Sequence, residues 1–277
     1  MTVKVLYWNC TTPSHLTGST VSQRKRDVIK EVVRDLAPDI LCLDECSLLV
    51  DGATSADDFA SSVLNSAGEY YDCKAVIENP GVHLNTAVWV KRSTQATFNA
   101  RARTGIPSVH WDSERTKRDL VEVRFTLAQP PPQPRREFTL FFLHANANTT
   151  NGVYACQLAV NHVTTAPGPV VFLGDFNCDV QNGNPHAVHP NVGGLTFTQW
   201  KTDQENRGSQ TVSRLTDRGE STSIIRYEPN RVIDYAVRNP NLATVNAMDS
   251  IDVSLGLHRL ADFICQFDHF PVMYDLS

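Results

Sequence analysis

The chain has 277 residues, of which 25 are Lys or Arg and 30 are Asp or Glu, so its formal net charge is −5. Hydrophobic residues make up 41% and charged residues 20%, a globular composition that excludes a disordered or fibrous protein. The acidic balance excludes a protein coated with basic residues for wrapping nucleic acid, and no apolar run approaches the roughly 20 residues of a membrane span. A polyanionic substrate would therefore be bound by local charge.

Eight short runs rich in Val, Ile, Leu and Phe predict β-strands. Several of these runs are apolar throughout, which indicates strands that are buried on both faces. In chain order the predicted strands are Val3–Trp8, Ile40–Leu43, Thr86–Val90, Leu120–Phe125, Phe138–His144, Pro169–Leu173, Val232–Val237 and Pro271–Tyr274.

Three segments between these runs predict helices. Ser22–Leu36 repeats apolar residues at the i, i+3, i+4 spacing of one buried face, with Ser22 as its N-cap. Asp57–Ala67 and Gly152–Val163 are the other two predicted helices. The first helix is expected to expose a basic face made of Arg24, Lys25, Lys30 and Arg34.

The order of these elements sets the expected fold class. Strands and helices mix without a strict βαβ alternation, which predicts an α+β layered fold rather than a doubly wound sheet. We expect residues 1–277 to form a single domain. Residues 182–230 are polar and lack a periodic pattern, so they are interpreted as functional loops with short elements inside.

Two further features concern the compartment. The N-terminus shows no signal peptide, so the protein is expected in the cytoplasm unless a leader has been removed. The seven cysteines include no CxxC pair of the kind that binds zinc, which favours reduced and mostly buried thiols. One or two disulfides stay open as the alternative for a secreted protein.

The strongest local signal lies at the end of one predicted strand. An apolar run from Val170 ends at Gly174 and is followed by Asp175 and Asn177, two residues apart. Alternation along an extended backbone places these two side chains on the same side, with Phe176 turned the other way. Strand ends that face solvent are where sites are commonly built, although a simple Asp/Asn turn would have the same pattern.

The same arrangement recurs along the chain, which argues against turns alone. Five other predicted strands end, begin or continue at polar residues that can bind a metal or move a proton. They are Asn9, the Asp44-Glu45 pair, His144, Asp234 and the Asp268-His269 pair.

These side chains suit one kind of chemistry. The oxygen ligands of Asn9, Glu45, Asp175, Asn177 and Asp268 match Mg²⁺, Mn²⁺ or Ca²⁺ rather than Zn²⁺. His144 and His269 can transfer protons near neutral pH, and Asp234 can orient one of the imidazoles. No Ser or Cys stands out as a nucleophile with a base beside it. The set therefore predicts metal-assisted attack of water on a phosphate ester.

The ordered motifs resemble the endonuclease/exonuclease/phosphatase superfamily over essentially the whole chain, from residue 8 to residue 272. They are Trp8-Asn9, Asp44-Glu45, His144, Gly174-Asp175-Phe176-Asn177, Asp234-Tyr235 and Asp268-His269-Phe270-Pro271-Val272. Within this superfamily, Val232–Val237, Phe267–Val272 and Leu143-His144-Ala145 most resemble the deoxyribonuclease I-like catalytic subunit of cytolethal distending toxin. The resemblance implies a four-layer α/β/β/α sandwich of two packed mixed β-sheets with outer helices.

The resemblance also implies a role for each matching residue. Glu45 would be the main metal ligand, with Asn9 and Asp268 beside it. Asp175 would orient or deprotonate the attacking water, and Asn177, together with Asn9, would hold phosphate oxygens. His269, polarised by Asp234, would contact the scissile phosphate, and His144 would serve as general acid or transition-state stabiliser. Arg118 resembles an arginine that contacts phosphate, and a solvated arginine at a strand start stays open as the alternative.

Two positions depart from the family pattern, and one basic cluster has two interpretations. Asp44 replaces the usual glutamine before the glutamate, and its carboxylate either sharpens metal binding or is solvated. Phe267 replaces the usual small polar residue before Asp-His, which alters the packing around His269. The cluster Arg24–Arg26 either grips a phosphate backbone or forms a solvated helix face, and the solvated face is the preferred interpretation.

The leading functional hypothesis is a Mg²⁺-dependent endonuclease that nicks DNA with little sequence preference. The alternative keeps the chemistry and changes the substrate to phosphoinositide or sphingomyelin head groups, with Thr196–Trp200 as a candidate aromatic membrane loop. The preferred interpretation of Thr196–Trp200 is a strand or turn that anchors the loop by burying Phe197 and Trp200. A third hypothesis is a catalytically inactive binding module. The intact carboxylates and both histidines argue against it, because a binding role would not need them together.

Overall fold

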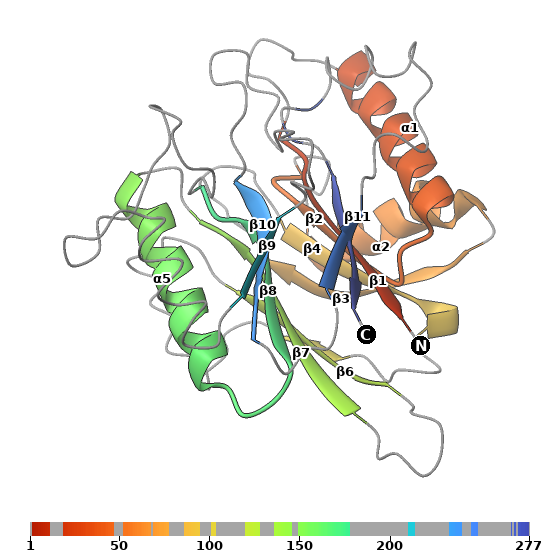
Figure 1. Ribbon diagram of the computed structural model, residues 1–277. Coiled ribbons are helices and arrows are strands. Elements are labelled where there is room, and N and C mark those ends of the chain that lie inside the picture. Colours follow the sequence, from red (N-terminus) through yellow and green to blue (C-terminus); the bar gives the residue numbers. More distant parts are fainter. Residues whose placement is uncertain are drawn as a thin grey trace.

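A computed structural model describes most of the chain (Figure 1). The described residues are 2–11, 19–46, 52–67, 69–77, 86–94, 101–103, 120–127, 136–145, 149–177, 210–213, 233–239, 245–248, 267, 269 and 271–276. Arg118, Asp268 and Thr196–Trp200 lie outside this set.

Two six-stranded mixed sheets form the centre of the molecule (Figure 1). The first sheet has the order β11-β12-β1-β2-β4-β3, in which β1 and β2 are parallel and the other described pairs are antiparallel. Its strands are β1 (Val3–Asn9), β2 (Ile40–Asp44), β3 (Tyr71–Ile77), β4 (Thr86–Lys91), β11 (Val245–Met248) and β12 (Val272–Leu276).

The second sheet repeats this plan. Its order is β5-β6-β7-β8-β10-β9, in which β7 and β8 are parallel and the remaining pairs within the described residues are antiparallel. Its strands are β5 (Arg101–Arg103), β6 (Val121–Leu127), β7 (Arg136–His144), β8 (Val170–Asp175), β9 (Gln210–Ser213) and β10 (Asp234–Arg238).

Helices cover the two outer faces (Figure 1). α1 (Ser19–Leu36) and α2 (Gly52–Ser62), followed by the 3₁₀ turn η1 (Leu64–Ala67), pack on the first sheet. α5 (Thr149–Thr165) packs on the second sheet, on the opposite side of the molecule. None of the described helices is long and apolar enough to cross a membrane.

Three hydrophobic clusters hold these four layers together. The cluster between the sheets takes buried apolar residues from eight of the described strands, including Tyr7 of β1 and Phe142 of β7, whose rings stack with centroids 6.4 Å apart. The cluster under α1 and α2 contains Trp8 and Trp89, and the one under α5 contains Phe172. Side chains that alternate along one strand therefore enter different layers, as Trp8 and Tyr7 do, which confirms the predicted four-layer sandwich.

All eight predicted strands are present, and each missed strand lies at a sheet edge. The missed strands are β3, β5, β9 and β11, which are the two ends of both sheets. An edge strand has one neighbour and one open side, so it does not need an apolar residue at every position. β3 illustrates this: it carries Asp72 and Lys74, and six of its seven residues are only half-buried.

The helices differ from their predictions in two respects. α1 begins at Ser19, three residues before the predicted N-cap, and Asp57–Ala67 is divided between the end of α2 and the 3₁₀ turn. The assignment of Lys25 to an exposed basic face is wrong, because only 1% of this residue is accessible. Arg24 is exposed and Arg26 half-buried, so a solvated face exists without the middle residue of the cluster.

Candidate active site

Strand register gathers the predicted site residues at one end of the sandwich. In the first sheet, Asn9 at the end of β1 lies opposite Asp44 at the end of β2. In the second sheet, His144 at the end of β7 lies opposite Asp175 at the end of β8, which in turn pairs with Asp234. The carboxyl ends of parallel strands meet at the same sheet edge, so each sheet contributes one row of polar side chains.

A buried hydrogen bond helps to join the two rows. Nδ2 of Asn9 in the first sheet donates to Oδ2 of Asp175 in the second sheet at 3.0 Å. Both residues are 1% exposed, so the contact is shielded from water. Packing of the two sheets therefore turns two separate strand ends into one site.

The backbone turns sharply directly after β2 and near the end of β8. Glu45 and Asn177 both have a φ of 47°, in the left-handed region that non-glycine residues rarely adopt. In each case an aspartate side chain compensates: Asp44 Oδ1 accepts from the Glu45 N–H at 2.9 Å, and Asp175 Oδ1 accepts from the Asn177 N–H at 2.7 Å. Such conformations cluster at functional sites, where the surrounding structure maintains them.

Two glycines allow the backbone to approach closely at the site. A Cβ on Gly174 would lie 1.8 Å from the carbonyl oxygen of Leu143, so only glycine fits between β7 and β8 at this position. A Cβ on Gly152 would lie 2.5 Å from the carbonyl oxygen of Phe176, where the first turn of α5 meets the Asn177 turn. Close packing of α5 thus supports the residues that follow β8.

His269 is held by an aspartate from the neighbouring sheet. Its Nδ1 lies 2.8 Å from Oδ2 of Asp234, and its Nε2 lies 3.9 Å from Oδ2 of Asp175. The indole N–H of Trp8 donates to the His269 carbonyl oxygen at 3.1 Å, which fixes the backbone. Burial, and then the negative charge of Asp234, raise the pKa of Asp175 to about 7.

His144 is held in the same way by Asp44. Nδ1 of His144 lies 2.7 Å from Oδ2 of Asp44, an atom that also accepts from the Tyr7 hydroxyl at 2.8 Å. Thr86 donates to the other carboxylate oxygen. Asp44 is 2% exposed and directed at an imidazole, so the solvated alternative predicted for it is wrong.

The second imidazole nitrogen of His144 faces the site. Nε2 lies 3.5 Å from Oε1 of Glu45 and 3.5 Å from Nδ2 of Asn177. Burial by itself lowers the pKa of His144, but the charges of Asp44 and Glu45 outweigh it and raise the pKa to about 9. The same attraction outweighs the effect of burial on Asp44 and holds its pKa below the usual range. His144 is therefore protonated at neutral pH.

Thr11 belongs to the site and was not predicted from the sequence. Its backbone N–H donates to Oδ1 of Asn9 at 3.0 Å, and its hydroxyl lies 2.8 Å from the same oxygen and also against Oε2 of Glu45. A single threonine in a loop has no periodic or spacing signal, so nothing short of the tertiary contact identifies it.

A group of buried ligand atoms could hold a cation. Among the described residues, one ligand atom from each of Asp175, Asp234 and His269 lies within 4.8 Å of the others, and all three residues are buried. Two neighbouring buried carboxylates repel each other, as the raised pKa of Asp175 indicates, and a divalent ion would relieve that repulsion. The donor set thus fits a divalent metal, although the predicted ligands were Glu45, Asn9 and Asp268.

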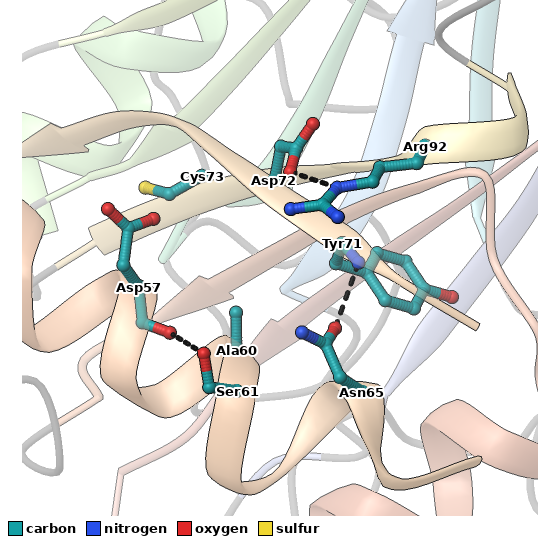
Figure 2. Close-up of a pocket in the computed structure, with 8 residues that line it drawn as sticks. All are labelled: Asp57, Ala60, Ser61, Asn65, Tyr71, Asp72, Cys73 and Arg92. Atoms are coloured by element: carbon teal, nitrogen blue, oxygen red, sulfur yellow. Dashed lines mark hydrogen bonds and ion pairs between the residues drawn. The ribbon is translucent and has the colours of Figure 1, made fainter. Parts of the chain in front are cut away.

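A pocket of about 390 Å³ lies elsewhere, between α2, η1 and β3 (Figure 2). Its wall includes Asp72, which is paired with Nε of Arg92 at 2.6 Å, and Asn65, which accepts from the Tyr71 N–H at 2.9 Å. None of the residues that line it belongs to the strand-end site. The candidate active site is therefore the cluster at the strand ends.

Comparison with solved structures supports the fold. The catalytic domain of human nocturnin, with a bound sulfate anion, is 17% identical with a TM-score of 0.55, and the match covers 100% of this chain and 93% of that one. Humanized D. rerio TDP2 is 12% identical with a TM-score of 0.59, over 100% and 99% of the two chains. ANGEL2, a 2′,3′-cyclic phosphatase in complex with adenosine-2′,3′-vanadate, is 16% identical with a TM-score of 0.56, over 99% and 95%.

Sequence comparison identifies the family. No curated protein sequence matches the chain. The sequence profile of the Endonuclease/Exonuclease/phosphatase family matches residues 18–254, which is most of its length. This chain therefore belongs to the Endonuclease/Exonuclease/phosphatase family, whose members are hydrolytic phosphoesterases that generally depend on a divalent metal.

Proposed function

We propose that the protein is a divalent-metal-dependent phosphodiesterase that nicks DNA with little sequence preference. The observation that carries this proposal is the pair of imidazoles, each held at Nδ1 by an aspartate, whose Nε2 atoms face the same cluster of carboxylates. Nε2 of His144 lies 3.5 Å from Glu45, and Nε2 of His269 lies 3.9 Å from Asp175. Hydrolysis of a phosphodiester needs a proton acceptor for water and a proton donor for the leaving oxygen, and this cluster offers both.

Glu45 and Asn9, together with Asp268, would hold the cation, for which Mg²⁺ is the proposed ion and Mn²⁺ or Ca²⁺ are substitutes. In support, Oε2 of Glu45 and Oδ1 of Asn9 both lie against the Thr11 hydroxyl, so two hard oxygen ligands converge on one point. A bound divalent ion would lower the pKa of a coordinated water and offset the charge of the phosphate. The buried Asp175, Asp234 and His269 form a second donor set on the other side of Asn9.

Each residue around the phosphate would then have its own role in the reaction. Asp175, whose pKa is raised towards neutrality, accepts a proton from the attacking water as its oxygen bonds to phosphorus. His269, oriented by Asp234, contacts the scissile phosphate, and Asn177 together with Asn9 holds phosphate oxygens. As the bond from phosphorus to the leaving oxygen breaks, protonated His144 donates its Nε2 proton to that oxygen.

One comparison favours a nucleic acid as the substrate, and the net charge does not argue against it. D. rerio TDP2, which shares the fold at 11% identity, has been solved with a single-strand DNA product. The net charge of −5 is compatible with DNA if the phosphate grip is confined to a few cations beside the site. Arg118 is the proposed cation of this kind, while the burial of Lys25 removes it from that role.

The domain organisation of the chain is also a proposal. We infer that residues 1–277 form one domain, because Val3 at the start of β1 pairs with Leu276 at the end of β12. β1 and β12 both contribute apolar side chains to the cluster between the two sheets. The suggested kinship with the toxin subunit stays a prediction.

A parallel substrate assay tests the function. Purified protein is incubated with supercoiled plasmid, RNA, phosphoinositides and sphingomyelin in Mg²⁺, with and without a chelator. We expect nicking of the plasmid, loss of nicking with the chelator, and loss with His269→Ala. His162→Ala serves as the matched control, because this imidazole of α5 packs against Phe141 and Phe172 outside the site.

Two results would redirect the assignment. Turnover of lipid head groups alone would make the protein a lipid phosphoesterase with the same chemistry. Absence of turnover on every substrate in Mg²⁺ and Mn²⁺, combined with stable metal-independent binding to a partner, would make it an inactive binding module.

A further inference from the structure

A lysine occupies the buried face of α1. Residues that lie four, seven, eight and eleven positions after Lys25 point into the cluster beneath the helix, and Lys25 shares their face. Those residues are Ile29, Val32, Val33 and Leu36. The helical repeat would accept an apolar residue at position 25, and only 1% of the lysine is exposed. Burying an ammonium group is costly, so this side chain needs a reason to be there.

The lysine side chain contacts two segments that are far apart in the sequence. Its Nζ donates to the carbonyl oxygen of Cys10, the residue after Asn9. The same Nζ lies 5.1 Å from the centroid of the Phe267 ring, two residues before His269. An ammonium can donate to a carbonyl oxygen and lie over the face of an aromatic ring at once, whereas an apolar side chain of similar length can pack on the ring but has no hydrogen to donate to the carbonyl.

Both segments are connected directly to the site. The Cys10 N–H donates to the Asp44 carbonyl oxygen at 2.6 Å, and the Cys10 carbonyl oxygen accepts from Lys25. The backbone of Cys10 is therefore held by β2 on one side and by Lys25 on the other. Phe267 packs on Trp8 with ring centroids 4.3 Å apart, and the Trp8 indole holds the His269 carbonyl oxygen. A shift of the Cys10 peptide would move Asn9, and a shift of Phe267 would move His269.

We propose that Lys25 is a positioning residue that fixes the segment carrying Asn9 against the segment carrying His269. It couples the proposed metal-binding side of the site to its phosphate-binding side through one buried ammonium group. Phe267 is its partner, which gives a role to the aromatic residue that replaces a small polar one before Asp268. The effect of this coupling on catalysis rests on the phosphoesterase function proposed above, whereas the coupling itself does not.

Three variants separate positioning from simple packing. Lys25→Met keeps the length of the side chain and removes the charge, and Lys25→Arg keeps the charge. Lys30→Met is the matched control, because Lys30 lies on the same helix and is only half-buried, whereas Lys25 is buried. Phe267→Leu keeps an apolar side chain and removes the ring face, so it tests the second contact if Lys25→Met does not fold.

The first readout is independent of activity. Hydrogen exchange of the Cys10 and Thr11 amides and the NMR signals of the His269 ring are measured in each variant. We expect about tenfold faster exchange and shifted His269 signals in Lys25→Met, with Phe267→Leu moving the same signals and Lys25→Arg and Lys30→Met close to wild type. Wild-type exchange and unshifted His269 signals in Lys25→Met, or in Phe267→Leu if Lys25→Met does not fold, would overturn the proposal.

The second readout is kinetic. On the substrate that the wild type turns over, Lys25→Met should lower kcat by about tenfold to a hundredfold while KM changes little, and Lys25→Arg should restore most of kcat. Equal losses in Lys25→Met and Lys30→Met would reduce Lys25 to an ordinary packing residue. If the wild type turns over none of the substrates, the proposed function fails, and the exchange readout still decides whether Lys25 couples the two segments.

Discussion

Nδ1 of His144 lies 2.7 Å from Oδ2 of Asp44, the residue directly before the proposed metal ligand Glu45. This pair mirrors the contact between His269 and Asp234 at 2.8 Å. Each imidazole is thereby held at one nitrogen and directed into the site with the other. Asp44, which replaces the usual glutamine before Glu45, is therefore paired with His144 on the opposite sheet.

The contact between Asp44 and His144 predicts how stability depends on pH in the metal-free protein. The pKa of His144 is raised from about 6.5 in an unfolded chain to about 9, so its stabilising effect is complete below pH 6.5 and is lost as the pH rises through 9. We expect the free energy of unfolding, measured with urea in a chelator, to fall by up to about 3 kcal/mol between pH 6.5 and 9.5.

Asp44→Asn should flatten that decline, because the neutral amide no longer favours the imidazolium. Asp35→Asn is the matched control, since this carboxylate is paired with Arg34 on the outer face of α1. Asp175, whose pKa is raised from an ordinary aspartate value to about 7, also lowers stability as the pH rises, but mainly between pH 4 and 7. An unchanged slope above pH 7 in Asp44→Asn would show that the pair does not form.

Removal of either imidazole should abolish most of the activity. We expect His144→Ala and His269→Ala each to lower kcat by about 10²–10⁴-fold, the range for loss of a proton-transfer group. Asp234→Asn keeps the shape and removes the charge that orients His269, so it should reduce kcat in the same direction. Steady-state kinetics of the nicking of supercoiled plasmid measures the effect, with His162→Ala as the control. Full activity in either alanine variant would remove that residue from the mechanism.

Metal affinity distinguishes the two donor sets. If Glu45 holds the cation, Glu45→Gln should weaken Mn²⁺ binding by more than about tenfold in a calorimetric titration, and Asp234→Asn should weaken it less. Addition of excess Mg²⁺ should restore activity to chelated wild type. The reverse order of the two variants would place the ion among Asp175, Asp234 and His269 instead.

Gly152 gives a test of the support behind the site. Gly152→Ala would bring a Cβ to 2.5 Å from the Phe176 carbonyl oxygen and 2.7 Å from that of Asn177, so the helix or the turn must move. We expect a loss of about 1–3 kcal/mol in stability by urea unfolding, together with a lower kcat. Gly168→Ala is the matched control, because a Cβ there meets nothing within 4 Å. Equal behaviour of the two variants would contradict this role of Gly152.

The interior strands could be predicted from the sequence, and the edges could not. β1, β2, β7 and β8 are apolar over most of their length because both faces are covered, so composition alone marks them. β3 lies at a sheet edge and is mostly half-buried, so polar residues such as Asp72 and Lys74 are tolerated in it, and the other missed strands are also edge strands. The site residues at the strand ends were predicted for the same local reason, since polar residues directly after an apolar run are visible in sequence.

The partners of those residues could not be predicted from the sequence. His144 is separated by a hundred positions from Asp44, and Lys25 by more than two hundred from Phe267, so each contact depends on how sheets and helices pack. By itself the sequence determined which chemical groups stand at the strand ends, because residue type and periodicity are local properties. Only the tertiary structure decided which carboxylate holds which imidazole and that Lys25 points inward, because burial and pairing arise from contacts between distant segments.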